Sequence, residues 1–211
     1  MKFSDIDFSA IGKMLDSMSD EEKEQINQYA NNMMENMQQN IEPEPVEEEP
    51  DFFEQLHIKE EDYQDLPGLV LDQIEAACDL EYYYEDDDQA DFSASVLFYA
   101  KAVLHLLRHY DFAIYKELLN PDGFANPNVT TLYSYLFPLT NEKNIHTLVD
   151  HGYGDTSGWL EIQMMIRQLY TLLNRAEYDT VSYDDLQALK SILFEQKGLL
   201  KIVECTETTE D

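Results

Sequence analysis

Apolar side chains recur at steps of three and four over residues 91–120, the longest such run in the chain. The repeating positions are Phe92, Val96, Tyr99, Val103, Leu107, Tyr110, Ile114 and Leu118. This spacing places them on one face of an α-helix, and further leucines widen that face until little of the circumference is polar. A helix that is apolar on most sides is usually buried by several neighbours. The pattern therefore predicts a central helix, either straight or with a bend near Asp111.

Shorter runs with the same period lie on both sides of the central helix. Residues 158–175 and 182–193 each carry a stripe of Leu, Ile or Met, and Pro67 suits the start of another helix. We expect an all-α fold, an irregular helical bundle or short helical array of about seven to eight helices. Segments 91–120 and 157–176 align crudely, either as an internal repeat or because buried helices resemble one another. After Gly198, the stretch LLKIVE is β-prone and predicts a short C-terminal strand or a final extended strap.

Composition divides the chain further. Residues 1–40 predict a separate helical arm with an amphipathic, Met-rich face, and residues 41–50, rich in Pro and Glu, predict an extended acidic linker. Residues 51–205 form the expected helical core domain, and residues 206–211 a polar tail. Flexible methionines suit contacts with a partner, and the alternative is that the arm helix docks on its own domain. The arm residues proposed to contact a partner are Met33, Met34 and Met37.

The charge of the chain limits what it binds directly. The formal net charge is −31, from 13 Lys and Arg against 44 Asp and Glu. Nucleic acids and anionic membranes both need a basic surface, so we expect the chain to bind neither directly. Between Glu42 and Asp91 there are 20 acidic residues and one basic residue, Lys59, a net −19. The acid is therefore concentrated, and the partner it favours is a basic protein.

The cysteines and the hydropathy bear on the compartment. Cys78 and Cys205 are far apart and belong to no CxxC pair, so we expect free thiols rather than a disulfide framework or a zinc site. The first residues lack the apolar region of a signal peptide, and no window has the roughly 20 apolar residues of a transmembrane helix. These features predict a cytoplasmic protein.

Tyrosines lie beside the densest acids. Tyr82, Tyr83 and Tyr84 directly precede the run Glu85, Asp86, Asp87 and Asp88. Aromatic rings and carboxylates together suit an Arg- or Lys-rich partner through cation–π contacts and charge-assisted hydrogen bonds. The alternative is a half-buried aromatic helix end that precedes a solvated acidic loop. We interpret the chain as a non-catalytic, highly acidic interaction module that binds a basic protein, with these seven residues as candidate contacts.

Two other functions have some support from the residues. His105 and His109 share a helix face, and His146, Asp150, His151 and Asp155 lie near a glycine-containing loop, so a metal-dependent enzyme is one alternative. Neither set matches a motif with a known mechanism, and we expect no catalytic residues, cofactor or metal. The other alternative is a mimic of nucleic-acid charge that occupies the basic groove of a nucleic-acid-binding protein.

The linker generates a testable prediction. A chain shortened to begin near Asp51 should retain the helical core, because the acidic, Pro-rich segment 41–50 is typical of a tether between separate units. Thermal melting followed by circular dichroism compares the shortened and full-length chains. A melting temperature lowered by tens of degrees would show instead that the arm is part of the core.

Overall fold

The computed structural model describes residues 19, 23, 24, 28, 51–84, 87 and 89–207. The chain divides into two units, Met1–Glu49 and Pro50–Asp211, and every helix named below belongs to the second unit. Most of the expected arm, including Met33, Met34 and Met37, and all of the expected linker lie outside the described residues.

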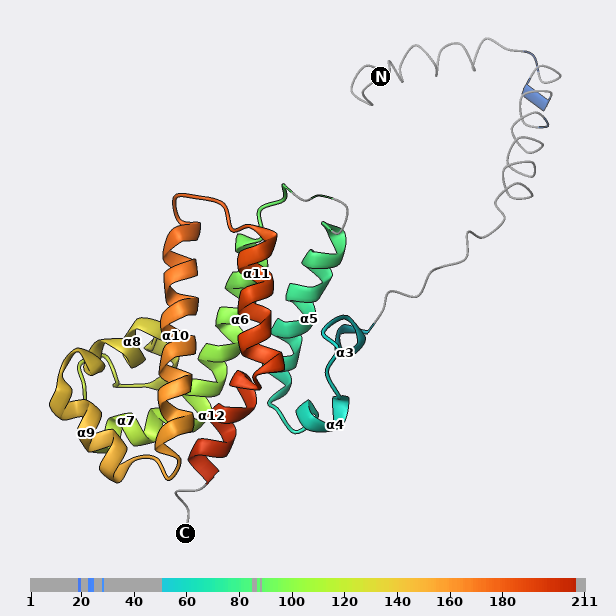
Figure 1. Ribbon diagram of the computed structural model, residues 1–211. Coiled ribbons are helices and arrows are strands. Elements are labelled where there is room, and N and C mark those ends of the chain that lie inside the picture. Colours follow the sequence, from blue (N-terminus) through green and yellow to red (C-terminus); the bar gives the residue numbers. More distant parts are fainter. Residues whose placement is uncertain are drawn as a thin grey trace. The chain divides into compact units, whose positions relative to one another are not determined.

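The described part of the second unit is helical and contains no strand, which confirms the all-α prediction (Figure 1). In chain order, the helices of this part begin with α3 (Phe52–Gln55), α4 (Glu60–Tyr63), α5 (Gly68–Tyr83) and α6 (Ser93–Leu106). They are followed by α7 (Phe112–Leu118), α8 (Leu132–Leu136), α9 (Glu142–His151), α10 (Thr156–Ala176), α11 (Tyr183–Lys190) and α12 (Gly198–Glu207). Short 3₁₀ turns at Pro127–Val129 and Phe137–Thr140 flank α8.

The predicted central helix is present and occupies the middle of the packing. It runs through α6, a π-helical segment at Leu107–Asp111, and α7. α6 packs against α5, α10 and α12, and its apolar face is buried at Val96, Tyr99 and Val103. The π-helical segment lies where the sequence allowed for a bend. Because α6 is covered by several helices, the all-round apolar pattern is explained by burial.

The expected C-terminal strand is wrong, because Gly198–Glu207 forms the helix α12. Leu199, Ile202 and Cys205, which recur at three-residue steps, are buried with at most 1% of their surface exposed. Burial of this helical face outweighs the β propensity of the local sequence. Gly198 is the first residue of α12. A Cβ atom at Gly198 would lie 2.7 Å from the backbone carbonyl oxygen of Ile192, as well as 2.6 Å from the mobile Met165 sulfur, so the close approach to the backbone favours glycine.

A buried polar contact joins three helices of the bundle. The Glu81 carboxylate on α5 accepts hydrogen bonds from the Tyr99 hydroxyl on α6 and the Lys190 ammonium on α11, both at 2.6 Å. The Glu81 and Lys190 side chains are only 10% and 15% exposed. The neighbouring Cys78 is a buried free thiol, 3.6 Å from the Tyr99 hydroxyl. Breaking one side of such a pair leaves a buried charge without its partner, so the contact fixes how α5 and α11 pack on α6.

A second buried polar group lies at the π-helical segment. Asp111 is 1% exposed, and its Oδ1 atom accepts a hydrogen bond from the Tyr153 hydroxyl. Burial raises the pKa of Asp111 to about 7, and the hydrogen bond from Tyr153 opposes this increase only in part. A carboxyl group in an apolar core favours its neutral form, since ionisation without water is costly.

The Asp111 pKa gives a stability prediction. The folded state holds a proton on Asp111 up to about pH 7, whereas an unfolded chain releases it near pH 4. The stabilisation from this proton is complete at low pH and is lost as the pH rises through about 7. From pH 5.5 to 8, the wild-type unfolding free energy should fall by about 2 kcal/mol relative to Asp111→Asn, from 1.36 kcal/mol per pH unit. Urea unfolding of both proteins measures this difference, and a difference that is constant with pH would contradict it.

Candidate protein-interaction surface

Two acidic segments distant in sequence meet at one end of the bundle, where α5 joins α6 and α10 joins α11 (Figure 1). The backbone N–H of Val181 donates to Asp91 Oδ1 at 3.0 Å, and the N–H of Phe92 donates to the Val181 carbonyl at 3.0 Å. The Phe92 ring also lies 5.7 Å from the ring of Tyr183. These contacts hold Asp91 and Phe92 against Val181 and Tyr183, where the two connections meet. We call the end of the bundle made by the described residues of 82–91 and 176–185 the acidic-aromatic end.

The acidic-aromatic end combines negative charge with exposed rings. Its two segments contain nine Asp and Glu residues and no Lys or Arg. Tyr83 and Tyr178 are 78% and 79% exposed, and Tyr183 is 51% exposed. Large aromatic side chains left this open to solvent are typical of contact surfaces, because their burial on binding is favourable.

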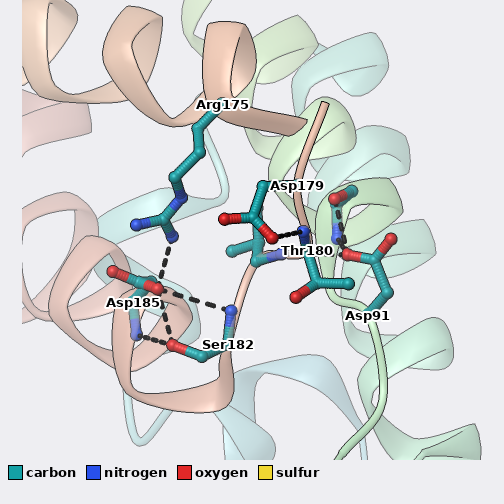
Figure 2. Close-up of polar contacts among 8 residues, drawn as sticks. Asp91, Arg175, Asp179, Thr180, Ser182 and Asp185 are labelled. Carbon is teal, nitrogen blue, oxygen red and sulfur yellow. Dashed lines mark hydrogen bonds and ion pairs between the residues drawn. The ribbon is translucent and has the colours of Figure 1, made fainter. Parts of the chain in front are cut away.

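Some of these carboxylates have structural roles, as Figure 2 shows for the junction around α11. Asp185 receives hydrogen bonds from the Ser182 N–H and hydroxyl and forms an ion pair with Arg175. The hydrogen bond from Arg175 and those from Ser182 lower the pKa of Asp185. Asp179 accepts from the Thr180 N–H at 2.9 Å. These contacts begin α11 and shape the turn before it.

Asp91 has the same role at the start of α6. Its Oδ1 atom accepts from the Ser93 hydroxyl and from the N–H groups of Ser93 and Val181. Partial burial alone would raise the pKa of Asp91, but these three hydrogen bonds stabilise the ionised form and lower it. By contrast, no hydrogen bond or ion pair within the described part of the chain engages the side chain of Glu177 or Asp184, which are exposed. The latter two are therefore available to a partner.

The exposed face of α5 extends the acidic-aromatic end along the bundle. Asp72, Glu75 and Asp79 lie on this face at helical spacing, and no cation among the described residues pairs with them. Like charges at such spacing destabilise a helix by about 0.2–0.5 kcal/mol per pair. Leu69, 60% exposed, begins the same face and Tyr83 ends it. The face therefore carries unpaired carboxylates between two exposed apolar groups.

The residues predicted from sequence as partner contacts are distributed unevenly in the structure. Tyr82 and Tyr83 end α5 with exposed side chains, and Asp87 is exposed in the following loop. Tyr84 is partly buried, with its ring edge-on to Phe92 at 6.3 Å. The remaining acidic candidates, Glu85, Asp86 and Asp88, lie outside the described residues.

Sequence reasoning missed the contribution of segment 176–185. Its pattern of Glu-Tyr-Asp followed by Ser-Tyr-Asp-Asp has the same acidic and aromatic composition as residues 82–91, which is a signal visible in the sequence. The adjacency itself depends on a hydrogen bond between positions 90 residues apart and has no local signal.

The histidines do not assemble into a metal centre within the described residues, where no group of three His, Cys, Asp or Glu side chains is placed to hold an ion. Partial burial, with Arg108 and Lys101 nearby, lowers the pKa of His105. His109 packs its ring on Tyr110, and His146 lies 4.0 Å from Glu142. Asp155 accepts from the Gly158 N–H and so begins α10.

Comparison with protein-family models, curated proteins and solved structures gave no match to this chain. Among the helices described here, none has the length and apolar composition needed to cross a bilayer. The fold and the acidic-aromatic end therefore carry the functional argument.

The hydrogen bonds at Asp91 predict which acids of this end matter for folding. Asp91→Ala removes the acceptor of three hydrogen bonds and should lower the unfolding free energy by about 1–2 kcal/mol near pH 7, because their donors lose an ionised acceptor. The stabilisation exists above the unfolded-state pKa near 3.9 and is lost as the pH falls through the lower folded-state value. Thermal melting near pH 7 measures the effect.

Glu177→Ala is the matched control, because it removes the same charge from the same end. Glu177 follows the last residue of α10, where a negative charge is unfavourable to the helix dipole. Its removal should leave stability unchanged or slightly higher. Equal losses in both variants would show that the Asp91 hydrogen bonds do not hold the junction.

Proposed function

We propose that this chain is a non-catalytic interaction module that binds a basic protein through its acidic-aromatic end. The observation that supports this proposal most strongly is that exposed Tyr83 and Tyr178 belong to two acidic connections that meet at Asp91 and Val181. Arg and Lys side chains bind tyrosine faces at about 0.5–1 kcal/mol per exposed contact and form charge-assisted hydrogen bonds to carboxylates. One surface then recognises both the charge and the shape of a cationic side chain.

Electrostatics favours the encounter as well as the contact. A net charge of −31 attracts basic proteins over a distance that salt shortens, about 10 Å at 0.1 M and about 3 Å at 1 M. The association rate and affinity should therefore fall as salt increases. The aromatic rings supply a contribution that salt screens much less, and this distinguishes a built surface from general attraction to negative charge.

The hydrogen bonds that these carboxylates accept within the chain argue against the alternative function, a mimic of nucleic-acid charge. Asp87, Asp91, Asp179 and Asp185 each accept a hydrogen bond from a backbone N–H of this chain. These acceptors serve the turns of the protein, whereas a mimic needs carboxylates presented outward at phosphate-like spacing. Exposed tyrosines are better suited to side-chain recognition.

The test removes the rings and keeps the charge. The probe is a synthetic Arg-rich peptide of mixed sequence, and the variant is Tyr83→Ala combined with Tyr178→Ala. Two lost cation–π contacts correspond to about 1–2 kcal/mol, so affinity measured by calorimetry at 0.15 M salt should fall roughly tenfold. The net charge near pH 7 is unchanged, so general attraction is preserved.

The control is Tyr133→Ala combined with Phe137→Ala, two exposed rings on α8 and the turn after it. This variant should bind the peptide within about twofold of wild type, a change well below the 1.4 kcal/mol of a tenfold effect. Equal affinities for all three proteins would mean that the peptide responds to net charge alone, and the proposal would fail.

A further inference from the structure

A surface groove lies between α10 on one side and α11, the π-helical segment Ser191–Glu195 and the start of α12 on the other. It consists of two adjoining hollows of about 370 and 400 Å³, which share Gln168 and Ile192. On α10 the groove extends from Glu161 to Leu172, about 17 Å at 1.5 Å per residue. That length corresponds to about three turns of a helix lying in the groove.

The groove is mainly apolar. Its apolar lining comes from α10 on one side and from α11 and the following π-helical segment on the other: Met164, Met165, Leu172, Ala188, Leu189 and Ile192. Met164 is 59% exposed, and Leu160, one turn earlier on α10, is 46% exposed. Apolar side chains therefore continue from the groove onto the surface beside it. Methionine side chains adapt their shape to what they contact.

One positive charge in the groove has no partner among the described residues. The lining contains two acids, Glu161 and Asp185, which form ion pairs with Lys201 and Arg175. Arg167 also lines the groove and is exposed, and no ion pair or side-chain hydrogen bond within the described residues engages its guanidinium group. In a chain with far more acid than base, this face presents an unpaired cation among apolar groups.

We propose that this groove is a second binding site, which takes an amphipathic helix of another protein whose apolar face carries one carboxylate opposite Arg167. Helices bind grooves of this kind through apolar residues at positions i, i+3, i+4 and i+7, which need about 10.5 Å of the available length. Arg167 recognises a carboxylate through two parallel hydrogen bonds, which sets the register of the helix. The chemistry of this partner is opposite to that expected at the acidic-aromatic end.

The two sites should respond differently to salt. The net charge of −31 repels an acidic helix, and screening reduces that repulsion. The affinity of the groove for such a helix should stay constant or rise between 0.05 and 0.5 M salt, whereas binding of a basic peptide at the acidic-aromatic end should fall. Failure at one site therefore leaves the proposal for the other intact.

The experiment selects helical peptides and asks which charge they carry. A displayed library of 14-residue helices, with apolar residues at i, i+3, i+4 and i+7 and one variable position on the same face, is selected against the full chain and against Arg167→Glu. We expect Asp or Glu at the variable position for the wild type, and Lys or Arg for the variant. The control is Lys143→Glu, which changes the net charge by the same amount as Arg167→Glu. Lys143 is an exposed residue of α9 with no ion pair among the described residues. This control should again select Asp or Glu at the variable position.

Binding of a selected peptide then locates the site. Met164→Glu places a charge in the apolar lining and should weaken the peptide at least tenfold, while thermal melting confirms that this exposed substitution leaves the fold intact. The proposal is wrong if no peptide is selected, if the selected charge is the same for wild type and Arg167→Glu, or if Met164→Glu has no effect. The proposal would also be wrong if the full chain self-associates and Met164→Glu abolishes that self-association, because the groove would then bind a second copy of this chain.

Discussion

Hydrogen bonding of Asp91 and Phe92 to Val181 joins the α5–α6 connection to the α10–α11 connection, and the acidic-aromatic end depends on this junction. The carboxylate of Asp91 contributes to the negative charge of this end, and it is also one of the groups whose hydrogen bonds join the two connections. Phe92 lies beneath the surface, 3% exposed, with Tyr84 and Tyr183 packed against its ring. Two acidic connections are therefore kept adjacent at this point by one hydrogen bond to the Asp91 side chain, one backbone–backbone hydrogen bond and an aromatic contact.

The distribution of charge follows from the same constraint. Carboxylates at this end that accept hydrogen bonds from backbone N–H groups begin helices or shape turns, so their charge contributes to folding. Glu177 and Asp184, and the row Asp72, Glu75 and Asp79 on α5, have no such contacts among the described residues. Their mutual repulsion destabilises the fold, and no local hydrogen bond among the described residues offsets it. This is the physical reason for proposing that these carboxylates contact a partner. The groove beside α10, with unpaired Arg167, has the opposite character.

Much of the fold could be predicted from sequence because helical periodicity and burial agree. The spacing of Val96, Tyr99 and Val103 identified the central helix, and all three are fully buried. The C-terminal strand was predicted wrongly because Leu199, Ile202 and Val203 favour strands locally, whereas burial against α10 is decided by the whole bundle. The π-helical segment at Leu107–Asp111 and the buried Asp111–Tyr153 contact also depend on tertiary packing and have no local signature.

The candidate surface was predicted only in its first half. Tyrosines followed by acids marked residues 82–88, and two of those tyrosines are exposed. That Tyr178 and Tyr183 complete the surface follows from one long-range junction, which single-sequence reasoning does not provide.

The most direct test of the account is an amide NMR titration of the labelled full chain with an Arg-rich peptide. If the two segments form one surface, the signals of residues in 82–91 and 176–185 should shift together and fit a single dissociation constant. Signals along α8 and α9 should remain in place. Shifts confined to one segment, or two clearly different dissociation constants, would contradict the claim that the junction builds a single binding surface.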